Sequence, residues 1–308
     1  MVKNFNIIDL DKLQKEFYRS YDPDYWLYRI MLLKNSHDNF EQLKDVLAKN
    51  TEETVDGDFK RVIRTELHFL YFQMVETLFE IIFATKHDNR DLWMALTFSN
   101  DKNTAFYSDN YKRIAELNEL SDIFTEEIKT DEGSNEVAVP LLRWIFYFIY
   151  PTKLSDDEWE TNLENIKDLL LIFSRDFKDR GEYNAYKHSL RFYNKPLSMS
   201  IGISGGKMHS LGSSEDCIVF LEEQKKMIDG KMISTEKVSK TSKPFDFQRD
   251  YDLCILIYTM IKNIICTRKY TLLEELHGKD FPLANFVNLS AFKITTPRTG
   301  IIKSSFTV

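Results

Sequence analysis

The sequence predicts a mainly α-helical protein that carries a small inserted β region. Only 10 glycines and 7 prolines interrupt the 308 residues, too few turn residues for many short strands. The 23 phenylalanines, 15 tyrosines and 4 tryptophans supply large side chains for a substantial core. Between residues 196 and 250 the pattern changes to serines, glycine pairs and short alternating segments, and this change predicts antiparallel strands.

The N-terminal part of the chain is expected to be a series of helices. Residues 8 to about 50 predict two or three of them, separated by "DPDY" and "NSHDN", where Asp22, Pro23 and Asp38 provide turn and capping chemistry. The strongest helical pattern runs from about residue 56 to residue 84. This helix is expected at the centre of a bundle, because its apolar positions keep a spacing of three to four: Leu67, Leu70, Met74, Leu78 and Ile81.

Two shorter helices and a loop are expected next. One helix begins near "DNRDLWMALTF" (88–98), where Asn89 or Asp91 is suited to cap it. Another extends from about Asp109 to Ile128. The segment "KTDEGSNE" (129–136) after it is expected to be a loop.

Proline and capping signals define the two helices that follow. Pro140 opens the aromatic run "LLRWIFYFIY" (141–150), and Pro151 ends it. Ser155 and Glu158 have the spacing of a capping box. The next helix is therefore expected to begin there and to continue to about Phe177.

The remaining elements complete the expected domain organisation. A helix is predicted over "EYNAYKHSLR" (182–191), ended by "NKP" at 194–196. Residues 1–195 are then a helical bundle, residues 196–250 a β insertion, residues 251–276 a helix that packs back on the bundle, and residues 277–308 an irregular C-terminal tail. The lysine-rich part of the insertion (225–243) suits contact with a phosphate backbone, or protection of exposed strand edges from pairing.

Charge, cysteine content and hydropathy exclude several classes of protein. The 48 acidic and 41 basic residues give a net charge of -7, which excludes a protein that coats nucleic acid through bulk positive charge. Cys217, Cys254 and Cys266 have no C-x-x-C spacing, which fits a reducing cytoplasm. The apolar runs at 141–151 and 253–266 are shorter than the roughly 20 residues that cross a bilayer, and the first residues are too charged for a signal peptide. A cytoplasmic protein without a membrane span is expected.

The most informative polar cluster lies in "EYNAYKHSLR". On a helix, Asn184 and His188 are four residues apart and Arg191 is three further on, so their side chains share one face that Lys187 borders. An imidazole beside cations suits phosphate chemistry, because arginine forms a bidentate hydrogen bond with a phosphate and histidine exchanges a proton near neutral pH. The same spacing also fits an ordinary solvated helix face, and both interpretations stay open.

Polar residues on the long helix are expected to be structural. His68 interrupts its apolar face and is predicted to be a partly buried histidine that is hydrogen-bonded across the bundle. Glu66, Glu76 and Glu80 are conceivable carboxylate ligands, but a di-metal bundle needs Glu-x-x-His pairs on two helices, and the long helix does not supply one, because the histidine follows Glu66 after two positions and not three. No metal site is expected.

The long helix with Glu66, Gln73 and Glu76, together with the later "YNAYKHSLR", resembles the HEPN superfamily over roughly residues 55–195. The resemblance implies a four- or five-helix up-and-down bundle, usually dimeric, with the polar motif at the dimer cleft. Many members are metal-independent ribonucleases of toxin–antitoxin and antiviral defence systems. Their motif is an arginine followed by asparagine or aspartate and then a histidine, with four to six residues between the arginine and the histidine.

The motif maps onto this chain with one departure. Asn184 falls on its polar position and His188 on its histidine, but Tyr183 holds the arginine position. Tyrosine does not replace the charge that holds the scissile phosphate, so Arg180 or, better placed, Arg191 is the candidate substitute.

The resemblance also implies a mechanism. The ribose 2′-hydroxyl attacks the adjacent phosphate while His188 acts as acid or base, and Asn184, Lys187 and Arg191 stabilise the phosphorane. Lys187, Tyr183 and Arg180 are the expected substrate contacts. A carboxylate from the long helix, Glu66 or Glu76, would raise the pKa of His188 and fix its orientation.

Two functions are therefore predicted. The first is an RNA-directed effector, a metal-independent endoribonuclease of defence or toxin–antitoxin type, whose homodimer builds its cleft around His188. The second is a non-catalytic dimeric scaffold of the same fold, whose β insertion and tail bind a protein partner. An open cleft at His188 with Lys187 and Arg191 converging on it favours the first, and burial of His188 against Glu66 or Glu76 favours the second. Neither function needs a metal or another cofactor.

Overall fold

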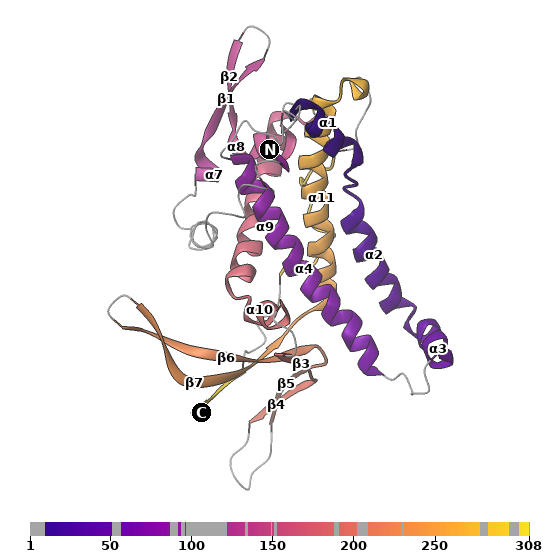
Figure 1. Ribbon diagram of the computed structural model, residues 1–308, viewed down its shortest axis with the longest axis vertical. Coiled ribbons are helices and arrows are strands. Elements are labelled where there is room, and N and C mark those ends of the chain that lie inside the picture. The colour runs from indigo at the N-terminus through magenta and orange to yellow at the C-terminus, as the bar shows by residue number, and fades with distance from the viewer. Residues whose placement is uncertain are drawn as a thin grey trace, which may run out of the picture. The chain divides into compact units, whose positions relative to one another are not determined.

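The structure is a computed structural model. It describes residues 10–50, 57–86, 92–93, 96, 122–132, 135–148, 150, 153–187, 191–201, 209–228, 231–277, 283–295 and 302–307. These residues are mainly helical with a small antiparallel β portion, which confirms the predicted fold class (Figure 1). They divide into two compact units, which we call the helical unit (Met1–Leu27, Met74–Lys178 and Leu256–Ala291) and the sheet unit (Tyr28–Gln73, Asp179–Ile255 and Phe292–Val308).

The helical unit has a core to which three helices each contribute one face. It contains α1 (Leu10–Ser20), the second part of α4 (Gly57–Lys86), α7 (Asp122–Thr125), α8 (Leu141–Tyr147), α9 (Asp156–Lys178), the larger part of α11 (Phe247–Leu272) and the short 3-10 helix η1 (Glu274–Leu276). Large apolar side chains at a helical spacing on α4, α9 and α11 have no exposed surface: Leu78, Phe79, Ile82, Ile166, Leu169, Phe173, Ile257, Ile261 and Ile264.

The start of α9 confirms the predicted capping box. The Ser155 main-chain N–H and Oγ–H both donate to Glu158 Oε2 at 2.9 Å, and the Glu158 N–H donates back to Ser155 Oγ at 3.4 Å. These hydrogen bonds hold the pKa of Glu158 below its usual value. The helix ends at Lys178, one residue beyond the predicted end.

A β-hairpin is present where the sequence predicts the end of a helix and a loop. The helix expected to reach Ile128 and the loop expected at 129–136 are wrong here, because β1 (Glu127–Glu132) pairs antiparallel with β2 (Asn135–Pro140). Residues 109–121 lie outside the described residues. The pairing of Ile128 with Val139 and of Thr130 with Val137 brings β-branched residues opposite each other, a stabilisation that a local pattern does not reveal.

The sheet unit combines helices with two small sheets. Its helices are the larger part of α2 (Tyr25–Asp38), α3 (Phe40–Asn50), the first part of α4, α10 (Gly181–Lys187) and the start of α11. One sheet has the order β3 (Phe192–Asn194), β6 (Cys217–Ile228), β7 (Lys231–Pro244) and β8 (Ile302–Thr307), all antiparallel. The other is the hairpin of β4 (Leu197–Ile201) and β5 (His209–Ser214).

The strands predicted between residues 196 and 250 are present, but the β portion extends beyond them. β3 lies before residue 196, and β8 lies in the tail that was expected to be irregular. Both depend on partners distant in the chain, since Val238 in β7 pairs with Phe306 in β8 and Phe220 in β6 pairs with Phe192 in β3.

β6 and β7 form a ribbon that is longer than its neighbours. β3 pairs only with Ile218–Phe220 of β6, and β8 pairs only with Lys237–Ser242 of β7. The ribbon continues past both as two strands to the Ile228–Lys231 pair, with a register shift between Glu223 and Lys225 (Figure 1).

One described helical segment, Phe59–Thr85 of α4, is long and apolar enough to cross a membrane. However, 78% of its most apolar window is buried inside the protein, as in the core helix of a soluble protein. Cys217, Cys254 and Cys266 are all buried and unbridged, and burial raises the pKa of each thiol. Each therefore behaves as a small apolar core residue.

Candidate functional site

The predicted motif helix is shorter than its sequence pattern suggests. α10 spans Gly181–Lys187, Arg191 lies in a bend and β3 begins at Phe192, so the helix predicted over residues 182–191 does not extend to Arg191. Asn184 and Arg191 therefore do not share a helix face. His188 lies outside the described residues, together with Ser189 and Leu190. Residues 192–194 form a strand because they pair with β6, whose sequence begins 23 residues after the end of β3.

The tyrosines of α10 are packing residues. Tyr183, at the arginine position of the motif, is 3% exposed, and its ring stacks on Phe72 with centroids 5.6 Å apart. Tyr186 stacks on Phe69 at 4.1 Å and donates its hydroxyl to Glu66 Oε2 at 3.3 Å. Burial, reinforced by the Glu66 carboxylate, raises the pKa of Tyr186. Both tyrosines thus fix α10 against α4.

The other predicted site residues are dispersed. Asn184 is exposed on α10, and Lys187 Nζ lies 4.7 Å from the centroid of the Tyr183 ring. Arg180 is half-buried before the helix, where its carbonyl accepts the Asn184 N–H at 3.0 Å. Glu76 belongs to the helical unit, whereas Glu66 belongs to the sheet unit. Arg191, which is exposed, lies beside a hollow surface.

His68 is the buried, hydrogen-bonded histidine that the sequence predicts. Its Nδ1 lies 2.7 Å from Asp250 Oδ2 and its Nε2 lies 3.7 Å from Glu182 Oε1. Phe245 stacks on the imidazole with centroids 4.6 Å apart. Burial by itself would lower the pKa of His68, but the two carboxylates outweigh it and raise that pKa to about 9.

A lysine completes this buried cluster, which we call the charged node: His68, Glu182, Lys243 and Asp250. Lys243 Nζ lies 2.7 Å from Glu182 Oε1 and also donates to the main-chain carbonyl of Asp179. Two cations and two carboxylates therefore meet from α4, α10, β7 and α11. Burial opposes ionisation of Glu182, but His68 and Lys243 outweigh it and lower the pKa of Glu182. Since its side chains are mostly enclosed, the charged node serves to join these elements rather than to receive a substrate.

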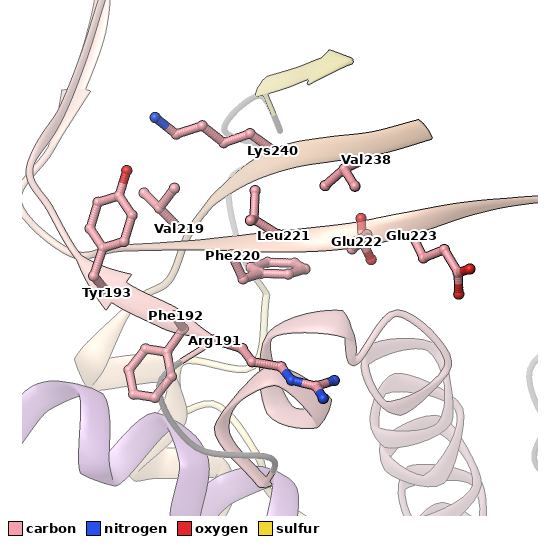
Figure 2. Close-up of a pocket in the computed structure, with 10 residues that line it drawn as sticks. All are labelled: Arg191, Phe192, Tyr193, Val219, Phe220, Leu221, Glu222, Glu223, Val238 and Lys240. Carbon is pink, nitrogen blue, oxygen red and sulfur yellow. The ribbon is translucent and has the colours of Figure 1, made fainter. Parts of the chain in front are cut away.

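The hollow surface is a groove of about 610 Å³ along β6, lined by side chains of β3, β6 and β7 and by Arg191. Figure 2 shows Tyr193, Val219, Leu221 and Lys240 on one side of β6, and Phe192 and Phe220 on the other. The strand alternation produces this division, because Tyr193 pairs with Val219, and Leu221 pairs with Lys240. We call this surface the β6 groove.

The β6 groove is apolar with charges at its border. Leu221 is 60% exposed and Tyr193 is 49% exposed, so both present apolar surface to solvent. Lys240 Nζ lies 5.8 Å from the centroid of the Tyr193 ring. In the described part of the chain, neither Lys240 nor Arg191 forms an ion pair. Lys240 thus lies next to this exposed apolar surface, whereas Arg191 lies across β6, on the side of Phe192 and Phe220 (Figure 2).

A glycine lets α10 approach β6 beneath the groove. A Cβ at Gly181 would lie 2.4 Å from Glu222 Oε1 and 2.8 Å from Phe220 Cε2. Glu222 Oε2 accepts the Thr241 hydroxyl at 2.8 Å, so its carboxylate is held on that side of the sheet. The local sequence gave no sign of Tyr193, Leu221 or Lys240 as site residues, because their common surface depends on the register of distant strands.

No protein-family model matches this chain, and neither the curated proteins nor the solved structures yield a match. The likeness to the HEPN superfamily accordingly stays a prediction. The chemistry of the described residues is therefore what supports any proposal on function.

Proposed function

We propose that this chain is a non-catalytic protein-interaction module that binds an apolar, acidic segment of a partner protein in the β6 groove. The observation that carries the proposal is the exposure of Leu221 and Tyr193 beside Lys240, with Arg191 across β6 at the other border of the groove. Neither cation forms an ion pair with any described residue. Exposed apolar surface bordered by charge is typical of protein-binding sites.

The chemistry of the groove defines the partner segment. An apolar partner side chain that covers Leu221 removes it from water, at about 25 cal/mol per Å² of buried apolar surface. Partner carboxylates opposite Arg191 and Lys240 set the orientation and reject basic segments. Tyrosine and arginine are also the residues that most often dominate the binding energy of an interface.

Defined peptides test this proposal. We expect an extended octapeptide of alternating glutamate and leucine to bind the full chain, measured by fluorescence anisotropy. A lysine–leucine octapeptide should bind roughly tenfold more weakly because it repels the two cations. A glutamate–serine octapeptide should bind weakly because it lacks apolar anchors.

Matched variants locate the binding. Leu221→Ala should lower the affinity for the glutamate–leucine peptide by roughly tenfold, a typical loss for a central apolar contact. Leu32→Ala is the control, since Leu32 is an equally large residue that is 67% exposed on α2. Equal affinity of the two variants, or equal affinity for the lysine–leucine peptide, would remove the proposal.

The second candidate function is the RNA-directed effector, acting as a homodimer. An exposed tyrosine with lysine and arginine nearby favours it, because single-stranded RNA stacks on aromatic rings and pairs its phosphates with cations. The net charge of -7 weighs against it. Glu222 and Glu223 in the groove do not separate the two functions, because they oppose RNA phosphates and partner carboxylates alike.

Incubation with mixed RNA in chelator, beside His188→Ala, tests this second function. Cleavage by the unmodified chain and none by the variant would favour the endoribonuclease. Tight binding of an oligouridine without cleavage would favour an RNA-binding module. Absence of both would leave the protein-interaction module.

A further inference from the structure

In the helical unit, a short extended segment is held almost entirely through its main chain. This strap, residues 283–287, has no regular secondary structure and follows η1 in the chain. Asn263 on α11 pairs with both main-chain groups of Ala284: its Nδ2 donates to the carbonyl at 2.7 Å, and its Oδ1 accepts the N–H at 3.2 Å. Asn263 thus pairs with both main-chain groups of Ala284, as a neighbouring strand would, and the Tyr147 hydroxyl also donates to the Ala284 carbonyl at 3.0 Å.

Two asparagines on α9 hold the next alternate residue. Asn162 Oδ1 accepts the Phe286 N–H at 2.6 Å, and Asn165 Nδ2 donates to the Phe286 carbonyl at 2.6 Å. Asn162 and Asn165 are three residues apart and therefore lie on the same face of α9. Main-chain groups at positions 284 and 286 face the asparagines, and Asn165 Nδ2 also lies 3.3 Å from the Val287 carbonyl that it donates to.

One side chain anchors the strap. Phe286 is 1% exposed, whereas Asn285 is exposed and Val287 is partly exposed. The recognition therefore consists of main-chain hydrogen bonds, which do not depend on sequence, and a single aromatic side chain.

One buried hydrogen-bond donor of this site has no acceptor in the strap. Asn162 and Asn263 are 0% and 1% exposed. Among the described residues, Asn162 Nδ2 has no acceptor, although its Oδ1 accepts from Phe286 and lies 3.1 Å from the Tyr147 hydroxyl. A buried amide donor without an acceptor is unfavourable, so a ligand that offers a carbonyl or hydroxyl oxygen there would fit better than the strap does.

We propose that Asn162, Asn165 and Asn263 form a peptide-binding site for which the strap is the resident ligand. The ligand that replaces it in trans is an extended segment of another protein with a large aromatic residue at the position of Phe286. This site lies in the helical unit and is independent of the β6 groove.

Complementation with a peptide tests the site. A fluorescent peptide with the sequence of residues 281–291 is titrated into full-length Phe286→Ala and into the unmodified chain, with anisotropy as the signal. We expect binding at least tenfold tighter to the variant, because the strap of the unmodified chain competes at a high effective concentration. The peptide carrying alanine at the Phe286 position should bind at least tenfold more weakly than the native peptide.

Matched controls distinguish binding at the asparagine site from non-specific binding of the peptide. Asn263→Ala in the Phe286→Ala background should weaken the native peptide at least tenfold, whereas Asn184→Ala, a change of an exposed asparagine on α10, should leave its affinity unchanged. A peptide with alanine in place of the exposed Asn285 should bind as well as the native peptide. Equal affinity for the native and alanine-286 peptides, or an equal effect of the two protein variants, would overturn the proposal.

A second measurement uses the unmodified chain, in case Phe286→Ala does not fold. The main-chain N–H groups of Ala284 and Phe286 are hydrogen-bonded and should exchange slowly with deuterium. Excess native peptide should accelerate their exchange severalfold by displacing the strap, and the alanine-286 peptide should not. Unchanged exchange with saturating native peptide would show that the strap is a permanent part of the fold and would end the proposal.

Discussion

The helical unit and the sheet unit both use buried polar side chains to join distant parts of the chain, but with different chemistry. In the helical unit, the neutral amides of Asn162 and Asn263 hold the strap through its main chain. In the sheet unit, the charged node links four elements, with Lys243 and His68 sharing the Glu182 carboxylate. Neutral amides fix a segment without responding to pH, whereas charges fix it only while they remain ionised.

The neutral amides and the charged node also differ in how much stability is lost when one hydrogen-bonding or ion-pair partner is removed. An amide that loses its partner leaves a buried polar group, which costs about 1–3 kcal/mol. A buried charge that loses its partner is more unfavourable, because it is left in a medium that solvates it poorly. The sheet unit should therefore be the more sensitive of the two to single substitutions at its buried polar residues.

Removal of the Asp250 charge is the strongest test of this difference. In Asp250→Asn, protonated His68 loses the carboxylate 2.7 Å from its Nδ1. We expect the free energy of unfolding to fall by about 3 kcal/mol. Asp38→Asn is the matched control, because Asp38 is 46% exposed in its ion pair with Lys34 and should cost less than about 1 kcal/mol. Urea unfolding measures both, and similar losses would contradict the special role of the charged node.

High pH should weaken the sheet unit through His68. Its pKa is raised to about 9 in the folded chain, above about 6.5 in the unfolded chain. The stabilisation is therefore complete below pH 6.5 and is lost as the pH rises through 9, a change of about 3 kcal/mol at most. Urea midpoints at pH 6.5, 8 and 9.5 measure it against His68→Gln. A parallel decline in the variant would assign the pH dependence to other groups.

Sequence reasoning found the residues whose role is decided locally. The capping box of Ser155 and Glu158 is confirmed, since it needs only residues three apart. His68 is confirmed as a buried, hydrogen-bonded histidine, because a polar residue within an apolar stripe must find a partner inside the protein. Which partner it finds was not predictable, since Asp250 lies 182 residues further along the chain.

Residues whose role depends on strand pairing were missed. Arg191 was predicted to share a helix face with Asn184, but α10 ends at Lys187, four residues before it. The β8 strand was missed because its partner β7 ends about sixty residues earlier in the chain. The β6 groove exists only once β3, β6 and β7 are in register, so no local pattern marks Tyr193, Leu221 and Lys240 as neighbours.

The contact of α10 with β6 offers a test that involves sterics rather than charge. Gly181→Ala would place a Cβ 2.8 Å from Phe220 Cε2, so the ring must move and the packing beneath the β6 groove must change. We expect a loss of about 2 kcal/mol, independent of pH. Asn184→Ala on the same helix replaces an exposed residue and should stay within about 0.5 kcal/mol of the unmodified chain. A loss that grew with pH would instead link this contact to the charged node.

The smallest expected effect comes from the neutral site of the helical unit. Asn263→Ala removes the two hydrogen bonds between Asn263 and Ala284, but the Tyr147 hydroxyl stays on the Ala284 carbonyl, and Asn162 and Asn165 stay on Phe286. We expect a loss of about 1 kcal/mol in the free energy of unfolding, because the strap can open locally and let water reach the Ala284 main chain. Since no titrating group is changed, the loss should be the same at pH 6.5 and at pH 9.5. Hydrogen exchange at the Ala284 and Phe286 amides would measure the local opening beside global unfolding in urea. A loss that matched Asp250→Asn in size or in pH dependence would mean that the two units do not differ in how they hold their buried polar groups.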